Sequence, residues 1–310
     1  MRPPLVVIVG PTASGKTQLA CELAVRLGGE VVSADSQQCY RGLDAGTAKP
    51  PPDELARAPH HLLDVADPED QLDAAAFVRL ADSALASIAS RGKRAIVAGG
   101  TGLWLRALLR GLVDAPGRSD AFRSGLREEI AHAGAPALHA RLAFVDPEAA
   151  SAIGPNDRAR IERALEVHAL SGRKLSELQR EHRFAGQRYP SLVLHLEPPR
   201  EVLRERIDRR TASLFASGAL ERETRWLLER IERVPAARKA LKIIGYGEMS
   251  RALGGEVTAA AAEALVAART RQYAKRQRTW FKKDAGPPIA WPPDARGLCE
   301  QALRWYEGAR

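Results

Sequence analysis

Cysteine is scarce in this chain of 310 residues, and no apolar run approaches the ~20 residues that a membrane-spanning helix needs. The three cysteines, Cys21, Cys39 and Cys299, show no C-x-x-C spacing. This pattern argues against a disulfide framework and against a zinc site, and it is typical of a reducing compartment. The sequence therefore predicts a cytoplasmic protein with no membrane attachment.

The chain is basic, and its positive charge is concentrated in one segment. Its net charge is +9, with 45% hydrophobic and 27% charged residues, as expected for a globular protein. Residues 269–283 contain seven lysines and arginines, no acid, and the aromatic side chains of Tyr273, Trp280 and Phe281. Such a mixture suits phosphate contacts and base stacking, although a solvated helix face has the same composition.

A complete phosphate-loop motif, G-x-x-x-x-G-K-[ST], follows an apolar run at residues 5–9 and precedes a helical pattern. This strand–loop–helix context is what the motif requires. Backbone N–H groups of such a loop favour anionic oxygens, Lys16 adds positive charge, and the Thr17 hydroxyl can bind Mg²⁺. We therefore predict a di- or triphosphate site made of Gly10, Pro11, Thr12, Ala13, Ser14, Gly15, Lys16 and Thr17.

Apolar runs alternate with helical patterns, which predicts an α/β fold with a P-loop NTPase-like parallel sheet flanked by helices. Strands are expected at residues 5–9, 30–34, 61–65, 94–98 and 191–196, and helices at 16–27, 74–91 and 101–110. Only helical patterns occur from 113 to 186, at 119–133, 135–144, 147–152 and 156–171. We therefore expect a discontinuous core of residues 1–112 and 187–310, with an all-helical insertion at 113–186.

Two loops at strand ends carry further chemistry, because ligands of such sheets bind beyond the carboxyl ends of the strands. Asp35 follows the second expected strand, where it can act as a general base, hold Mg²⁺ through water, or cap a helix. The strand at 95–98 is followed by Gly-Gly-Thr-Gly, without the aspartate typical of motor NTPases. That absence disfavours an ATPase or GTPase and leaves a small kinase open.

Taken together, these segments resemble the tRNA dimethylallyltransferase family in its bacterial form. The similarity also covers Ser-Ala-Asp-Ser-Gln at 33–37, Gly-Thr-Ala-Lys-Pro at 46–50, Pro-His-His-Leu-Leu-Asp at 59–64, Pro-Asn-Asp at 155–157, Ile-Gly-Tyr at 244–246 and Arg-Gln-Tyr-Ala-Lys-Arg-Gln at 271–277. Order and spacing hold from residue 5 to about 283. The zinc finger of eukaryotic relatives is missing, and Gly247 replaces a basic residue that is common in the family.

The resemblance implies an enzyme that transfers a dimethylallyl group from dimethylallyl diphosphate to tRNA. The acceptor is the exocyclic amine of the adenine 3′-adjacent to the anticodon, in tRNAs that read codons starting with U. The products are N6-dimethylallyladenosine and diphosphate, Mg²⁺ assists, and no ATP is consumed. The family implies a tRNA-gripping role for the helical insertion, and we expect a monomer.

The resemblance also implies roles for particular residues. Asp35 would accept a proton from the attacking amine, and Thr101 and Arg210 would contact the donor's phosphates. The family's tRNA contacts map onto Asp35, Ser36, Gln37, Gln38, Thr101, Arg123, Ala159, Arg160, Ile161, Glu162, Arg163, Lys242, Gly245, Tyr246, Lys275, Arg276, Gln277, Arg278, Trp280 and Lys282.

Two alternatives use the same loop. A small-molecule or nucleotide kinase would require ATP and has no use for the basic, aromatic segment at 269–283. A non-catalytic RNA-binding protein with a relic phosphate loop would not need Asp35.

Overall fold

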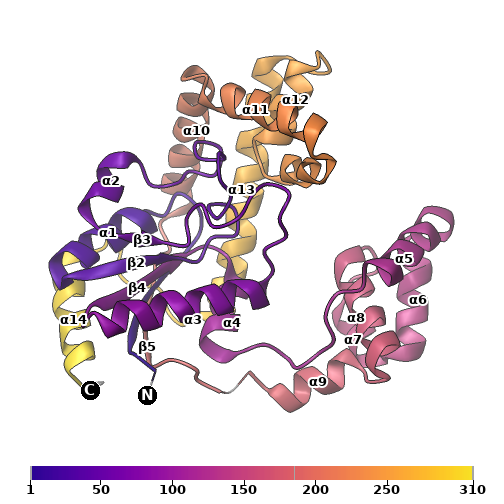
Figure 1. The fold of residues 1–310 in the computed structure, drawn as a ribbon, viewed down its shortest axis with the longest axis horizontal. Helices are drawn as coiled ribbons and strands as arrows, with labels where there is room; N and C mark the ends of the chain where they lie inside the picture. The colour runs from indigo at the N-terminus through magenta and orange to yellow at the C-terminus, as the bar shows by residue number, and fades with distance from the viewer. Residues whose placement is uncertain (1, 185, 309–310) are drawn as a thin grey trace. The chain divides into compact units, whose positions relative to one another are not determined.

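The computed structural model describes residues 2–184 and 186–308, and their contacts divide the chain into two compact units (Figure 1). The α/β unit combines the chain up to Leu109 with the chain from Arg188 onward. The helical unit runs from Arg110 to Gln187. No helix among the described residues has both the length and the apolar character required to cross a membrane.

The α/β unit is built on one parallel sheet of five strands in the order β3-β2-β4-β1-β5. The strands are β1 (Leu5–Val9), β2 (Gly29–Ser33), β3 (His60–His61), β4 (Arg94–Gly99) and β5 (Ser191–His195). In register, Val7 of β1 lies between Val97 of β4 and Val193 of β5. The predicted fold class is confirmed.

The third strand is the one that sequence patterns placed wrongly. It was expected at residues 61–65, but β3 has only two residues, His60 and His61. Leu62 and Asp64 adopt positive φ angles of 66° and 53°, which are incompatible with an extended strand. An apolar pattern therefore continued past the point where the backbone turns away from the sheet.

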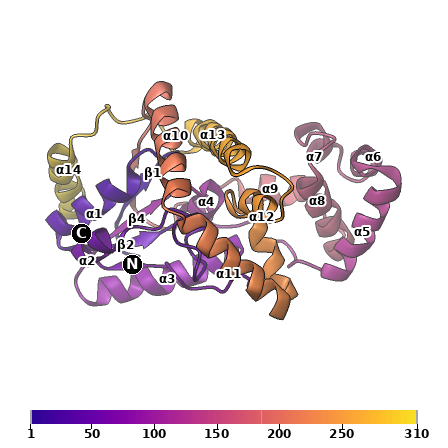
Figure 2. The same ribbon diagram turned by 90° about the horizontal axis from the view of Figure 1, so that it is seen from above.

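Helices cover both faces of this sheet (Figure 2). On one face, Phe77 and Leu85 of α3 (Ala74–Ser90) and Trp104 of α4 (Gly102–Arg110) pack against the strands. The other face is covered by α1 (Lys16–Leu27) and α14 (Ala295–Gly308). The remaining elements of the unit are α2 (Pro52–Arg57), α10 (Arg200–Ala216), α11 (Ala219–Arg233), the 3₁₀ helix η1 (Pro235–Lys242), α12 (Tyr246–Leu253) and α13 (Ala259–Asp284).

The helical unit contains α5 (Asp120–Ala133), α6 (Ala135–Val145), α7 (Pro147–Ala152), α8 (Arg158–Ser171) and α9 (Leu175–His182). Leu126, Leu138, Leu142 and Ile161 form the centre of its core. Side-chain caps define several helix starts, since Ser119 and Asp146 accept hydrogen bonds from backbone N–H groups of the first turns. The sequence patterns did not predict α9, a polar helix of eight residues.

A buried carboxylate links the helices of this unit. Glu166 of α8 has no exposed side-chain surface and accepts bonds from Arg123 at 2.8 Å, Arg163 at 2.8 Å and the Ser119 N–H at 2.8 Å. Burial alone would raise the pKa of the Glu166 carboxyl, but these hydrogen bonds outweigh it and lower the pKa to about 2. Two arginines expected to contact tRNA thus also hold the unit together.

We predict that Glu166→Gln destabilises the helical unit by about 3 kcal/mol near neutral pH, because one pKa unit corresponds to ~1.4 kcal/mol. The folded-state pKa is lowered, so the wild-type contribution is complete above about 4.5 and is lost as pH falls toward 2. Hydrogen exchange of the α5 and α8 amides in the full chain measures this stability contribution. Equal protection in wild type and variant at pH 6 would disprove this role.

Candidate active site

The phosphate loop occupies residues 10–17, between the end of β1 and the first turn of α1. Gly10 has a φ of 154°, and a Cβ there would lie 2.4 Å from the Leu196 carbonyl oxygen, so only glycine fits. Gly15 has a φ of 88° and directly precedes the helix. The loop therefore wraps around the N-terminus of α1, where backbone N–H groups favour an anion.

Two polar groups in this loop suit a phosphate ligand. The Ser14 hydroxyl oxygen is buried and has no hydrogen-bond partner among residues 2–184 and 186–308. The Lys16 ammonium donates to the Pro11 carbonyl at 2.7 Å. Burial lowers the pKa of Lys16 to about 8; nearby Asp35 opposes this shift, and Arg210 adds to it. A bound diphosphate would relieve both the desolvation of Lys16 and its repulsion from Arg210.

The loops that follow β2 and β4 are joined to each other. The Ser36 N–H donates to the Thr101 hydroxyl at 2.9 Å, and that hydroxyl donates to the Ser36 hydroxyl at 3.1 Å. The Asp35 carboxylate accepts from the Gln37 N–H at 2.9 Å, in a local turn and not as a helix cap. The backbones touch, because a Cβ on Gly99 would lie 2.1 Å from the Ala34 carbonyl oxygen. Asp35 is therefore held on a rigid base.

Gln277 of α13 connects these loops to the phosphate loop. Its side-chain oxygen accepts from the Thr12 N–H at 2.8 Å, and its side-chain nitrogen donates to the Gly100 carbonyl at 2.9 Å. The residue is only 5% exposed. Sequence reasoning expected Gln277 to touch tRNA, whereas here both ends of its amide bind the protein backbone.

One turn away along α13, Tyr273 extends the same wall. Its hydroxyl is hydrogen-bonded with Thr101 and Gln277, and burial raises the pKa of Tyr273. Arg269, Tyr273 and Gln277 are spaced four residues apart, which puts them on one face of the helix. Arg269 and Tyr273 line the cavity but were not predicted as site residues. Their spacing in the sequence was a signal that could have identified them.

The loops and α13 enclose one cavity of about 640 Å³ in the α/β unit. It is lined by these predicted residues: Thr12, Ala13, Ser14, Gly15, Lys16, Thr17, Asp35, Gln37, Gln38, Arg210, Lys242, Arg276 and Gln277. Arg210 of α10 lies 3.4 Å from the Thr12 hydroxyl. Ser36 and Thr101 do not line the cavity and support its wall instead.

Other predicted contacts lie outside the cavity. Tyr246 has no exposed surface, and its hydroxyl donates to Glu223 at 2.6 Å, while Gly245 is the N-cap residue of α12. Arg278 pairs with Glu197 at 2.7 Å, and the Trp280 ring packs against Arg106. Lys275 and Lys282 are exposed on α13.

The predicted contacts of the helical unit also differ in exposure. Ile161 is fully buried in its core, so its side chain is assigned to packing. Ala159 and Arg160 are exposed, and Glu162 is half-buried.

The residues that could hold a metal ion are few. Thr17 and Asp35 both line the cavity. Within residues 2–184 and 186–308, no group of three or more His, Cys, Asp or Glu side chains is arranged to bind a metal. A divalent cation would therefore need oxygens from a bound diphosphate as well, which is how Mg²⁺ is commonly held.

A parallel sheet with a phosphate loop, an adjacent carboxylate and a basic cavity defines a P-loop-type α/β protein that binds an organic diphosphate or nucleotide. The family model described as "IPP transferase" matches residues 38–284. The chain therefore belongs to the IPP transferase family, and the resemblance inferred from its motifs is confirmed.

Curated relatives match over nearly the whole chain. A tRNA dimethylallyltransferase of Anaeromyxobacter sp. (strain K) is 53% identical over 96% of this chain and 97% of its own length. A tRNA dimethylallyltransferase of Geobacter sulfurreducens is 49% identical over 97% of this chain and 96% of its own length.

Solved structures share the fold. A tRNA Δ(2)-isopentenylpyrophosphate transferase from Staphylococcus epidermidis is 32% identical, with a TM-score of 0.69 over 99% of this chain and 100% of that chain. A eukaryotic dimethylallyltransferase acting on tRNA is 30% identical, with a TM-score of 0.76 over 90% of this chain and 70% of that chain.

The pKa of Lys16 makes anion binding pH-dependent. Lys16 is charged below pH 8 and loses its proton above it, so we predict a constant diphosphate Kd up to about pH 7 and a rise of roughly tenfold by pH 9. Calorimetric titration with an organic diphosphate measures this, with Lys16→Arg as the variant that stays charged. A wild-type Kd that is the same at pH 7 and pH 9 would rule out the assigned protonation.

Proposed function

We propose that this chain transfers a dimethylallyl group from dimethylallyl diphosphate to the exocyclic amine of the adenine 3′-adjacent to the anticodon of tRNA. The observation that carries the proposal is that a phosphate loop with Lys16 and a carboxylate, Asp35, line the same cavity. Membership of the IPP transferase family, with relatives named tRNA dimethylallyltransferase, makes the chain an enzyme of this type.

The phosphate-loop end of the cavity suits the donor. Backbone N–H groups of residues 10–17, together with Lys16 and Arg210, would bind the diphosphate and stabilise the charge that develops on it as it leaves. A divalent metal generally accompanies prenyl diphosphate donors in this family, and we propose Mg²⁺, which Thr17 would help to hold together with oxygens of the diphosphate. The metal would offset part of the negative charge of the diphosphate.

The Asp35 end suits the acceptor. The exocyclic amine of adenine is a weak nucleophile, so a base within hydrogen-bond reach of its proton speeds the attack. The new C–N bond forms as the allylic C–O bond breaks, the diphosphate leaves with the bonding electrons, and Asp35 takes the proton from nitrogen. Holding both reactants in one cavity removes the entropy cost of bringing them together.

The adenine must leave its stack to enter the cavity, so we propose that the enzyme binds a flipped base. Gln37 and Gln38 line the cavity beside Asp35 and are the proposed base contacts. Exposed basic residues outside the cavity, Arg160, Lys275 and Lys282, are proposed to contact the phosphates of the anticodon stem-loop, with the helical unit gripping it.

All the proposed reacting groups come from one chain, so we propose that the enzyme acts as a monomer. We also propose that it acts in the cytoplasm, where tRNA is found.

The proposed function is tested by incubating the protein with dimethylallyl diphosphate, Mg²⁺ and unmodified tRNA, without ATP. Mass analysis of the digested nucleosides should show N6-dimethylallyladenosine in tRNAs that read codons starting with U. A control with Ala in place of Lys16 should show little product. An absolute requirement for ATP would refute the proposal and favour a kinase.

Replacing Asp35 with Asn should lower the single-turnover transfer rate by roughly 10²–10⁴-fold, because an amide cannot accept the amine proton. The variant keeps the shape of the side chain and the bond from the Gln37 N–H, so donor and tRNA affinities should stay within about threefold of wild type. Transfer at the wild-type rate would exclude Asp35 as the base.

A further inference from the structure

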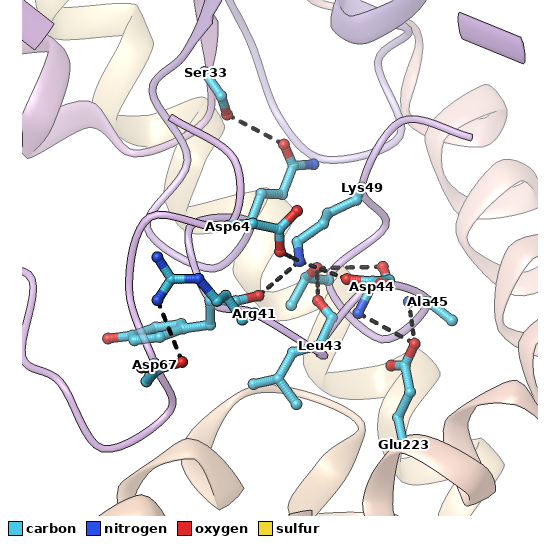
Figure 3. Close-up of polar contacts among 12 residues, drawn as sticks. Ser33, Arg41, Leu43, Asp44, Ala45, Lys49, Asp64, Asp67 and Glu223 are labelled. Atoms are coloured by element: carbon cyan, nitrogen blue, oxygen red, sulfur yellow. Dashed lines mark hydrogen bonds and ion pairs between the residues drawn. The ribbon is translucent and has the colours of Figure 1, made fainter. Parts of the chain in front are cut away.

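The Lys49 ammonium is bound by surrounding oxygens (Figure 3), and its neighbour in the chain, Ala48, lines the cavity. The Lys49 side chain is only 6% exposed. Its ammonium donates to the Tyr40 carbonyl at 2.6 Å and to the carboxylates of Asp44 and Asp64, each at 2.5 Å. An ammonium has three N–H groups, so Lys49 keeps none for a ligand. Through Asp44 and Asp64, Lys49 connects both ends of the segment 44–49 to the chain that follows β3.

Glu223 of α11 holds the same segment from the other side (Figure 3). Its carboxylate accepts from three successive backbone N–H groups, those of Asp44 at 3.1 Å, Ala45 at 2.7 Å and Gly46 at 3.2 Å. The Tyr246 hydroxyl also donates to it. A Cβ on Gly46 would lie 2.6 Å from the Tyr246 ring, so the segment is pressed against α12.

The backbone is strained within residues 44–49 and at the residue after β3 that pairs with Lys49. Ala48 has a φ of 55°, and Asp64, which pairs with Lys49, has a φ of 53°. Residues other than glycine rarely adopt such angles, and they persist where surrounding contacts hold them. Strain beside a cavity commonly has a functional purpose.

The strained segment determines how Gln38 is oriented. The Gln38 side-chain nitrogen donates to the Ala48 carbonyl at 2.8 Å, and the Ser33 hydroxyl donates to the Gln38 side-chain oxygen at 3.2 Å. A carbonyl oxygen only accepts hydrogen bonds, so the amide nitrogen must face Ala48. Gln38, Gly46 and Ala48 all line the cavity. The amide therefore keeps one N–H and one oxygen lone pair for a ligand.

We propose that Lys49 and Glu223 are positioning residues that fix residues 44–49, so that the Ala48 carbonyl orients the Gln38 amide to select adenine. The inference rests on the proposed function, in which Gln38 faces the acceptor base. When its nitrogen faces Ala48, the remaining N–H and oxygen of the Gln38 amide can pair with the adjacent acceptor and donor atoms on one edge of adenine. A purine without the exocyclic amine would lose its hydrogen bond to Gln38 as well as the one to Asp35.

The test uses the full chain without donor and two synthetic anticodon stem-loops, with adenine or unsubstituted purine at the acceptor position. Fluorescence anisotropy measures both affinities in wild type, Lys49→Met and the control Lys93→Met, which changes an exposed lysine in the turn before β4. Wild type and control should prefer adenine by at least tenfold, since one hydrogen bond accounts for about tenfold and the amine would also contact Asp35. In Lys49→Met the preference for adenine should be at least threefold smaller than in the wild type, while the diphosphate Kd stays unchanged.

An unchanged adenine preference in folded Lys49→Met, no preference in the wild type, or an equal loss of diphosphate affinity would overturn the proposal. If Lys49→Met does not fold, Glu223→Gln carries the test, because it keeps the volume and one acceptor oxygen while removing the charge. We expect it to reduce the preference partly, and an unchanged preference would again overturn the proposal. Failure of dimethylallyl transfer in the wild type would refute the proposed function separately, because these binding ratios require no chemistry.

Discussion

The side-chain amide of Gln277 is the interaction on which the arrangement of the site depends. It accepts from the phosphate loop at the Thr12 N–H and donates to the β4 loop at the Gly100 carbonyl. Without it, two backbone groups in a confined interior would lose their partners, at a cost of about 1–3 kcal/mol each. Because Thr101 of the same β4 loop supports Ser36, the Gln277 side chain adds to the sheet and the Ala34–Gly99 backbone contact in fixing Asp35 relative to the phosphate loop.

The site combines opposite electrostatic demands. Lys16 and Arg210 repel each other, so a bound anion would stabilise both, whereas the role proposed for Asp35 requires a carboxylate that is free to accept a proton. Placing the cations at the helix N-terminus and the carboxylate at a neighbouring strand end lets one cavity hold a leaving diphosphate and an attacking amine. Loops that follow β1 and β2 at one edge of the sheet, together with α10, supply these groups.

Local rules predicted most of the fold from the sequence. The helix at residues 16–27 was predicted with its observed bounds, and four of the five strands were placed to within one residue, because buried β-branched runs and glycine breaks signal them directly. The error at β3 arose because its end depends on the positive φ of Leu62, which a hydrophobic pattern does not show.

The site was predictable where motifs are local and was not where contacts are distant in sequence. The phosphate loop and Asp35 were found from their neighbours, and their proposed chemical roles stay predictions. Gln277 and Arg123 bind partners that lie 43 or more residues away in the sequence, and Tyr246 binds one that lies 23 residues away. No short sequence pattern shows these contacts. In these positions the three side chains bind other parts of the protein, and their predicted tRNA contacts stay predictions.

The central claim is that one cavity brings the donor's diphosphate and the acceptor amine together beside Asp35. The most direct measurement is a crystal structure of the protein with a non-reactive donor analogue and an unmodified anticodon stem-loop. The account predicts diphosphate on residues 10–17 and a flipped adenine whose amine nitrogen lies within about 3.2 Å of the Asp35 carboxylate. A stacked adenine, or an amine placed away from Asp35 with the diphosphate bound, would contradict it.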